Sequence, residues 1–357
     1  MIKKIKAWLI FRDEKKIKLK HKYRILEDWG EPINYIGQPH SGFSESGLAP
    51  REIIQKWSIA DLTFDPQIDR AYNNDEFKFI TLFDTDYPQD LKNLYCPPMF
   101  LFYRGDLSIC DNCVGIIGTR KVSNYGVRVV NNFVRELAFN KLTIVSGLSF
   151  GVDAEAHRAT LKAEGKTIAI LPGSLDRVYP DANRKLADQI AETGLVLSEY
   201  PPGQTVERWH FPERNRLISG ISKAVIMIEG GIKSGALITA RFALEQNKLL
   251  YAVPGDIYRD VASAPNTLIS QGATPALSAK VILEDLGIDS KQEGSAPNLP
   301  INNPIYNCLK ESGEPIDMDT LIELTGQNFG ELAANLLELE MSEIIRRIAG
   351  GRYTIIA

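Results

Sequence analysis

A chain of 357 residues that is 44% hydrophobic and 24% charged is long and apolar enough for two or three domains. It contains no run of about eighteen apolar residues, and its start lacks the small-residue cleavage site of a signal peptide, so we expect neither a membrane span nor a signal peptide. Four cysteines are too few for a disulfide framework, so we expect a cytoplasmic protein.

The charge is distributed unevenly along the chain. A net charge of −4 argues against a surface that is positive throughout, but it is compatible with a local basic groove. Residues 1–30 carry ten Lys and Arg against four Asp and Glu, whereas residues 301–357 carry four against nine. We therefore expect the two ends to meet different partners.

Residues 1–75 show short helical patterns separated by glycines and prolines. This pattern predicts a small helical domain. Its lysines either contact a nucleic-acid backbone or form a solvated helix face. Residues 77–106 are typical of two strands around a proline-rich turn and lead into the main domain, which we place at 76–287.

Within the main domain, short β-branched runs alternate with helical patterns, which predicts an α/β fold with a doubly wound, mostly parallel sheet. The predicted strands cover residues 114–118, 143–147, 167–171, 195–199, 223–229 and 249–253. The predicted helices cover residues 125–139, 152–164, 181–192, 213–220 and 235–246, with short helices around 266–271 and 278–286.

The composition of residues 288–303 is that of a linker. Beyond it, the pattern predicts a winged-helix-like domain over 304–357, with helices at 304–312, 317–324 and 328–340 and a hairpin at 343–356. In winged helices the third helix usually enters the DNA groove. Here it reads FGELAANLLELE and has no Lys or Arg, so we expect it to contact protein instead.

The buried-strand pattern from Val114 onward ends at Gly118, Thr119 and Arg120, and Ser123 can cap the helix that follows. A loop of this kind at the carboxyl end of a parallel strand is suited to anions. The loops after the other strands are also rich in glycine, hydroxyl groups and charge. Together they predict one crevice at the carboxyl edge of the sheet.

Several kinds of site are disfavoured by spacing. No GxGxxG run or P-loop is present, which argues against a dinucleotide or Walker-type site. Cys110-x-x-Cys113 lacks the second cysteine pair of a structural zinc site, so we expect no metal and no cofactor. Asp153 and His157 form either an acid–base pair or, more commonly, a helix cap and a buried hydrogen-bonded histidine.

Residues 208–216 place arginines among aromatic residues. Arginines suit phosphates, and exposed aromatic rings stack on unpaired bases, so this stretch indicates a groove for single-stranded nucleic acid. The alternative is that Trp209 and Phe211 are core residues and that the arginines pair with Glu207, Glu213 or Glu229.

The motifs as a set resemble those of the DNA-processing protein DprA (Smf) family. The matching runs are GTRK, SGLSFGVDAEAH, LPGSLDRVYP, SEYPPG, FPERNRLISG, SGALITARFALEQ and AVPGD, which lie in this order between residues 118 and 256. The resemblance implies an extended Rossmann-like fold without catalysis that binds single-stranded DNA. It also implies protection of incoming DNA during natural transformation, loading of the RecA recombinase, and a homodimer. An N-terminal module of sterile-alpha-motif type is typical of the family, although residues 1–75 match it poorly.

The loop composition and the resemblance together give one set of expected DNA-contacting residues. These are Gly118, Thr119, Arg120, Lys121, Arg208, Phe211, Arg214, Asn215, Arg216 and Lys233. The phosphates are expected on the amides of residues 118–120 and on the arginines, with bases stacked on Phe211. The alternative function is a nucleotide-processing enzyme, similar to a phosphoribohydrolase, with Glu229 or Asp153 as its acid.

Overall fold

The computed structural model describes residues 1–38, 49–62, 66–74, 77–289, 303–341 and 344–355. The chain divides into two compact units, Met1–Ser290 and Lys291–Ala357. Each unit has its own core, and each is described by itself.

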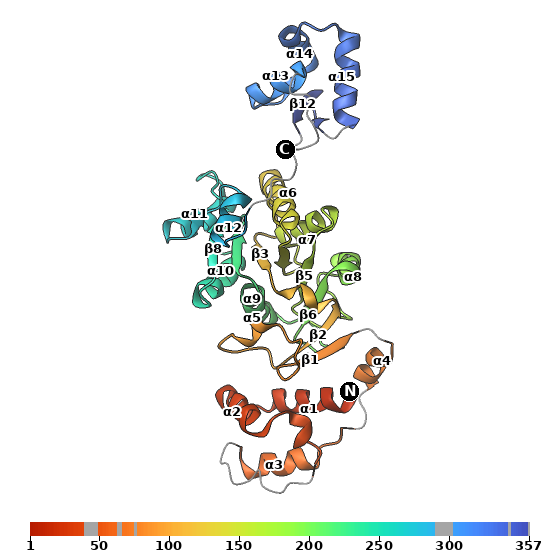
Figure 1. Cartoon of the computed structure of the whole chain (residues 1–357), viewed down its shortest axis with the longest axis vertical. Helices are drawn as coiled ribbons and strands as arrows, with labels where there is room; N and C mark the ends of the chain where they lie inside the picture. The colour runs from red at the N-terminus through yellow and green to blue at the C-terminus, as the bar shows by residue number, and fades with distance from the viewer. Residues whose placement is uncertain (39–48, 63–65, 75–76, 290–302, 342–343, 356–357) are drawn as a thin grey trace. The chain divides into compact units, whose positions relative to one another are not determined.

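The first unit contains a nine-stranded sheet in the order β1-β2-β6-β5-β4-β3-β7-β8-β9 (Figure 1). Strands β3 to β9 pair in parallel, while β2 is antiparallel to both β1 and β6. The predicted doubly wound, mostly parallel sheet is therefore confirmed. The strands are β1 (Lys78–Thr81), β2 (Phe100–Gly105), β3 (Cys113–Ile117), β4 (Thr143–Ser146), β5 (Thr167–Ile170), β6 (Leu195–Ser198), β7 (Ala224–Met227), β8 (Leu249–Ala252) and β9 (Thr274–Pro275).

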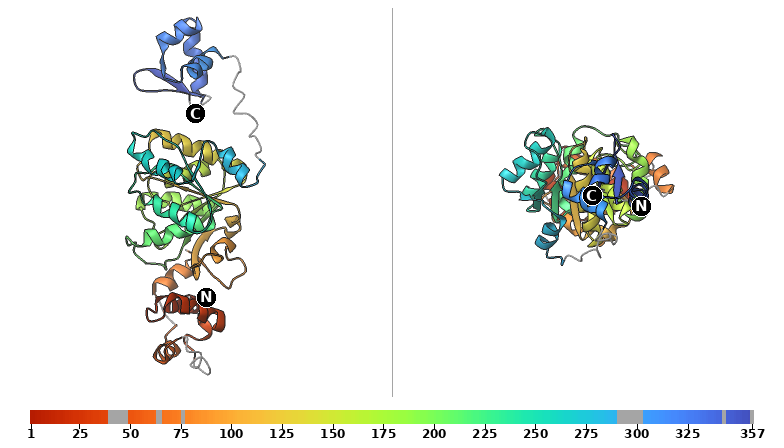
Figure 2. Two further views of the ribbon diagram at one scale, coloured as in Figure 1. Left: turned by 90° about the vertical axis from the view of Figure 1, so that its left-hand side faces the viewer. Right: turned by 90° about the horizontal axis from the view of Figure 1, so that it is seen from above.

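Helices cover both faces of this sheet, as the side view of Figure 2 also shows. One face packs against α6 (Asn124–Phe139), α7 (Val152–Lys162), α8 (Arg184–Thr193) and α12 (Ala279–Asp285). The other packs against α5 (Gln89–Lys92), α9 (His210–Ile221), α10 (Ala236–Glu245) and α11 (Ser263–Ser270). The strands between them are buried on both sides, which explains why they are apolar throughout rather than alternating.

Local sequence signals explain where these elements begin. The Ser123 hydroxyl accepts a hydrogen bond from the Gly126 amide at 3.2 Å, so the predicted cap of α6 is confirmed and the helix begins at Asn124. The helix predicted at 213–220 begins earlier, at His210. The helix predicted from residue 181 begins at Arg184, because a short 3-10 turn at Asp181–Asn183 comes first.

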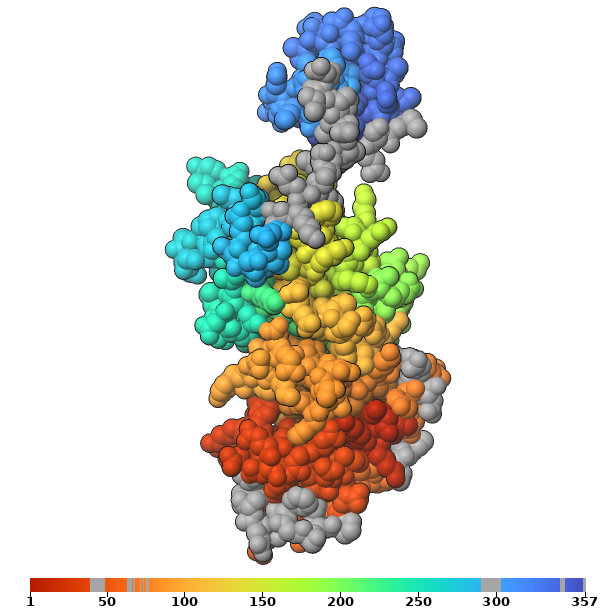
Figure 3. All heavy atoms as spheres, in the orientation of Figure 1, coloured from red at the N-terminus to blue at the C-terminus, as the bar shows by residue number. Residues whose placement is uncertain are grey.

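The N-terminal segment is helical, as predicted, and shares a core with the sheet. It contains α1 (Ile2–Asp13), α2 (Leu19–Trp29), a 3-10 turn (Pro32–Asn34), α3 (Arg51–Ser58) and α4 (Pro66–Asn73). The ring of Trp8 lies 6.0 Å from that of Phe100 on β2, and Figure 3 shows the two segments in continuous contact. The predicted domain boundary near residue 76 stays a prediction, since both sides of it belong to one compact unit.

The second unit is a winged helix. Its elements are α13 (Pro304–Ser312), β10 (Ile316–Asp317), α14 (Met318–Thr325), α15 (Phe329–Met341), β11 (Ile345–Arg347) and β12 (Arg352–Ile355). The three predicted helices and the hairpin are confirmed, and β10 adds a short third strand to the sheet. Gly350 and Gly351 have φ values of +85° and +72°, which explains why the hairpin turns at two glycines.

Among the described residues, no helix has the length and apolar content that a membrane crossing requires. Of the predicted linker over 288–303, residues 290–302 lie outside the described residues, as do residues 343 and 356 at the two ends of the predicted hairpin.

The charges of the winged helix predict weak binding of duplex DNA. Glu331 and Glu338 are exposed on α15, whereas the exposed arginines lie on the hairpin. In gel-shift titrations, a fragment of residues 300–357 should bind duplex DNA only at low salt, because phosphates are repelled from α15. The double variant Glu331→Gln/Glu338→Gln should bind more tightly than the native fragment. Tight binding by the native fragment at physiological salt would contradict this prediction.

Candidate nucleic-acid interface

A cavity of about 640 Å³ lies where the strand order of the sheet reverses. Strand β3 is followed along the chain by β4 on one side, while β7 is its neighbour on the other. Ligands of doubly wound sheets bind at this switch point, outside the carboxyl ends of the strands. The cavity is lined by the loop after β3 (118–120), the loop after β4 with the start of α7 (149 and 153), one side of α9 (211, 212, 214, 215 and 218) and the loop after β7 with the start of α10 (231–236).

The loop after β3 is held tightly by its neighbours. The Thr119 amide donates to the Glu229 carbonyl oxygen at 2.7 Å, and the Thr119 carbonyl accepts from the Val152 amide at 3.1 Å. A Cβ at Gly118 would lie 2.6 Å from the Val152 side chain, so only glycine fits there. The Thr119 amide therefore already has an acceptor within the protein.

Arg120 and Phe211 meet at the mouth of the cavity. The Arg120 guanidinium lies over the Phe211 ring at 5.2 Å from its centroid, and Tyr179 contacts the same ring edge-to-face at 5.7 Å. Arg120 is exposed and makes no ion pair in the part of the chain that the structure describes. Stacking on a ring leaves the N–H groups of a guanidinium free for an anion.

Arg214 lines the same cavity but is buried, at 3% exposure. Its guanidinium donates to the carbonyl oxygens of Gly147, at 2.5 Å, and Ile170, at the ends of β4 and β5. Burial lowers the pKa of Arg214 to about 10, while Asp153 acts in the opposite direction, so the side chain is protonated at neutral pH. Its main contacts are therefore structural: it joins the ends of two strands beneath the site.

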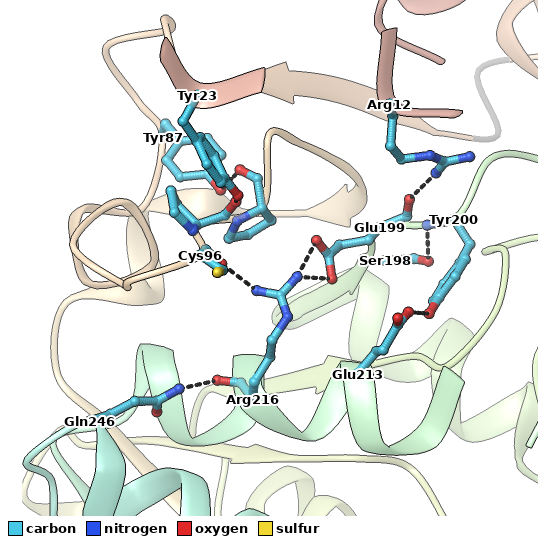
Figure 4. Close-up of polar contacts among 12 residues, drawn as sticks. Arg12, Tyr23, Tyr87, Cys96, Ser198, Glu199, Tyr200, Glu213, Arg216 and Gln246 are labelled. Atoms are coloured by element: carbon cyan, nitrogen blue, oxygen red, sulfur yellow. Dashed lines mark hydrogen bonds and ion pairs between the residues drawn. The ribbon is translucent and has the colours of Figure 1, made fainter. Parts of the chain in front are cut away.

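Arg216 lies on the opposite side of α9 and does not reach the cavity. Its guanidinium binds both carboxylate oxygens of Glu199, at 2.5 and 2.6 Å, and the Cys96 carbonyl oxygen at 2.8 Å (Figure 4). The Glu199 carboxylate keeps the pKa of Arg216 above its usual value despite the opposing effect of burial. The structure thus separates Arg216 from the expected DNA-contacting set.

The other expected residues divide into two groups. Asn215 and the exposed Lys233 line the cavity, whereas Lys121 and Arg208 are exposed outside it. Sequence reasoning missed Ser234 and Asp260, which also line it. Ser234 lies in a loop whose glycine and hydroxyl content indicates the crevice, but nothing in the sequence brings Asp260, which follows β8, to this place.

Two family models match the chain from residue 78 onward. A model described as "DNA recombination-mediator protein A" matches residues 78–287. The chain belongs to this family. A model described as "DprA winged helix domain" matches residues 291–351. The resemblance inferred from the motifs is therefore confirmed, and membership of the family supports a role in DNA processing and recombination.

Individual family members agree with this assignment. The chain is 42% identical over 223 residues to the DNA processing protein DprA of Bacillus subtilis, covering 62% of this chain and 75% of the relative. It is 36% identical over 316 residues to the protein Smf of Synechocystis, covering 77% and 79%. The solved structure of DprA from Streptococcus pneumoniae superposes with a TM-score of 0.65 at 30% identity, covering 78% of this chain and 96% of that one.

A second solved member of the family comes from Helicobacter pylori. It superposes with a TM-score of 0.54 at 34% identity, covering 59% of this chain and 96% of that one. A single-stranded DNA binding mode is described for that protein.

In this member of the family, the two candidate acids have structural partners. The Glu229 carboxylate accepts from both the amide and the hydroxyl of Ser123, at 2.9 and 2.5 Å, and so holds the start of α6. Asp153 is buried and accepts from the Ser149 amide at 3.3 Å, and burial raises its pKa. The described residues hold no group of three or more His, Cys, Asp or Glu side chains placed to bind one metal ion.

His157 does not pair with Asp153. Its Nδ1 lies 2.7 Å from the Thr167 hydroxyl, and the ring is fully buried, as the structural interpretation of this residue predicted. Burial, with the nearby charges of Arg214 and Arg158, lowers the pKa of His157 to about 3. The imidazole is therefore neutral in the folded protein.

This buried histidine predicts a loss of stability in acid. An unfolded histidine has a pKa of about 6.5. Between about pH 6.5 and 3 the unfolded chain therefore binds more protons than the folded chain, and the free energy of unfolding decreases as the pH is lowered. From pH 7 to pH 5, the contribution of His157 should fall by about 2 kcal/mol. His157→Gln, which cannot titrate, should lose less stability than the native chain over this range in urea unfolding. Equal losses would show that the ring is accessible to protons.

Proposed function

We propose that this chain binds single-stranded DNA without a catalytic step. The observation that carries the proposal is the exposed Arg120 guanidinium stacked on Phe211 at the mouth of the switch-point cavity. The guanidinium offers a fork of N–H donors to a phosphate, and a ring beside it offers a face to an unpaired base. Lys233 adds a second exposed positive charge on the loop after β7.

The family supports the rest of this proposal. Single-stranded DNA binding is named for the Helicobacter pylori protein, and we extend it to this chain on the basis of the cavity. We further infer protection of incoming DNA during natural transformation and loading of a RecA-type recombinase onto it. A homodimer in the cytoplasm is part of the same proposal.

The alternative, a phosphoribohydrolase-like enzyme, has no observation in its favour at this site. Such an enzyme needs a carboxylate free to act on a ribose. Both oxygens of Glu229 accept hydrogen bonds from Ser123, and Asp153 lies at the buried end of the cavity next to the Arg214 charge. We therefore propose binding rather than turnover.

Arg120→Ala should weaken single-stranded DNA binding without unfolding the protein, because the side chain is exposed and stacks on the Phe211 ring at the surface. Fluorescence anisotropy at about 50 and 200 mM salt should show roughly tenfold weaker binding and a salt slope smaller by about 0.7, the value for one lost phosphate contact on a single strand. Arg158→Ala, which removes an exposed arginine of α7 outside the cavity, is the matched control. Unchanged affinity and slope with an intact circular dichroism spectrum would refute the assignment.

Phe211 should contribute through its ring face. Phe211→Ala should weaken binding by about 1–3 kcal/mol, whereas Phe211→Tyr should stay close to native. Because the ring also orients Arg120, a double-mutant cycle between the two positions should give a coupling energy above about 0.5 kcal/mol. Strictly additive effects in anisotropy titrations would show that the two side chains act independently.

A further inference from the structure

Trp209 is an exposed aromatic side chain that does not line the switch-point cavity. It is 52% exposed, and it lines a second cavity, of about 450 Å³, on the other side of α9. This cavity lies between the N-terminal helices, the segment before β2 and the loop after β6, with Leu19 and Phe100 among its apolar residues. The start of α9 thus separates two cavities, with Phe211 in one and Trp209 in the other.

The indole is held in a fixed orientation. Its Nε1 donates to the Glu207 carboxylate at 2.5 Å, and its ring contacts His210 edge-to-face at 4.0 Å. His210 is buried and packs against Tyr200 at 4.1 Å, and the Tyr200 hydroxyl donates to Glu213 at 3.0 Å. An exposed ring that is fixed in this way loses little conformational freedom when a ligand stacks on it.

The charges around the second cavity disfavour an anion inside it. Arg216 is matched by Glu199, as Figure 4 shows, and Arg12 is matched by Asp13. Glu213 leaves the lining side chains with one negative charge in excess. A phosphate would therefore be repelled, whereas a neutral, planar group with hydrogen-bonding edges is compatible with this lining.

Arg208 lies next to the indole in sequence, outside the cavity. It is exposed, and it makes no hydrogen bond or ion pair within the described part of the chain. An arginine beside an exposed aromatic ring suits a nucleotide, with the base on the ring and the phosphate on the guanidinium.

We propose that this second cavity is a base-binding subsite for the same DNA strand. One unpaired base stacks on Trp209, its phosphate lies on Arg208, and the strand continues past the start of α9 to Phe211 and Arg120. The proposal rests on the proposed function and adds to it a site that only a strand long enough to cover both cavities can fill. A protein partner that inserts an apolar side chain against Trp209 is the competing occupant.

Tryptophan fluorescence tests the stacking directly. Of the four tryptophans, Trp8 and Trp57 are fully buried and Trp29 is half-buried, so Trp209 is the one best placed to report a bound base. Saturation of the full chain with an oligothymidylate of about 20 nucleotides should quench the emission, and Trp209→Phe should remove this quenching while affinity stays near native. Trp209→Ala should bind the long oligonucleotide roughly 5- to 150-fold more weakly, yet bind one of about 6 nucleotides as the native chain does.

The controls separate this subsite from the proposed function. Arg120→Ala should weaken binding at both lengths, whereas Phe139→Ala, an exposed aromatic at the far end of α6, should change neither. Native affinity of Trp209→Ala for the long strand, or quenching that persists in Trp209→Phe, would overturn the subsite but leave the proposed function standing. If the cavity instead binds a protein partner, Trp209→Ala should leave the affinity for the long strand unchanged. Absence of any single-strand binding by the native chain would overturn both proposals.

Discussion

The switch point of the sheet depends on Glu229, which connects three elements at once. Its carbonyl oxygen accepts from the Thr119 amide, and its buried carboxylate accepts from the amide and hydroxyl of Ser123. The end of β7, the loop after β3 and the start of α6 are thereby fixed relative to one another. Because a buried carboxylate without these donors would be strongly destabilised, the loop that carries Arg120 has one favoured conformation.

Arg214 plays a similar part beneath the cavity. Its buried charge lies against carbonyl oxygens at the ends of β4 and β5 and next to the Asp153 carboxyl group, so it holds the floor of the site together. Among the lining side chains, Arg120, Arg214 and Lys233 outnumber the acids Asp153 and Asp260, so the site is locally positive on a protein whose net charge is −4. A local basic site on an acidic protein favours phosphates at one place and limits nonspecific attraction elsewhere.

Much of the fold could be predicted from the sequence, because buried parallel strands and amphipathic helices leave clear periodic patterns. The loop after β3, the Ser123 cap and the winged helix were all identified in this way. Which of Arg120, Arg214 and Arg216 line the same cavity could not be predicted from the sequence. Arg214 and Arg216 are two positions apart on α9, yet only Arg214 lines the cavity, and the rotation of α9 and the position of Glu199 determine this. The half-exposed Trp209 was likewise undecided, since composition does not distinguish a core indole from a surface one.

The N-terminal helices and the sheet share one aromatic core. Trp8 packs against Phe100 and Phe83, and the Tyr23 hydroxyl donates to the Pro97 carbonyl oxygen. A chain shortened to begin at β1 would turn this aromatic layer into an exposed apolar surface prone to aggregation. The helical segment is therefore an integral part of the sheet domain. Its sequence can change only in ways that keep these aromatic residues covered.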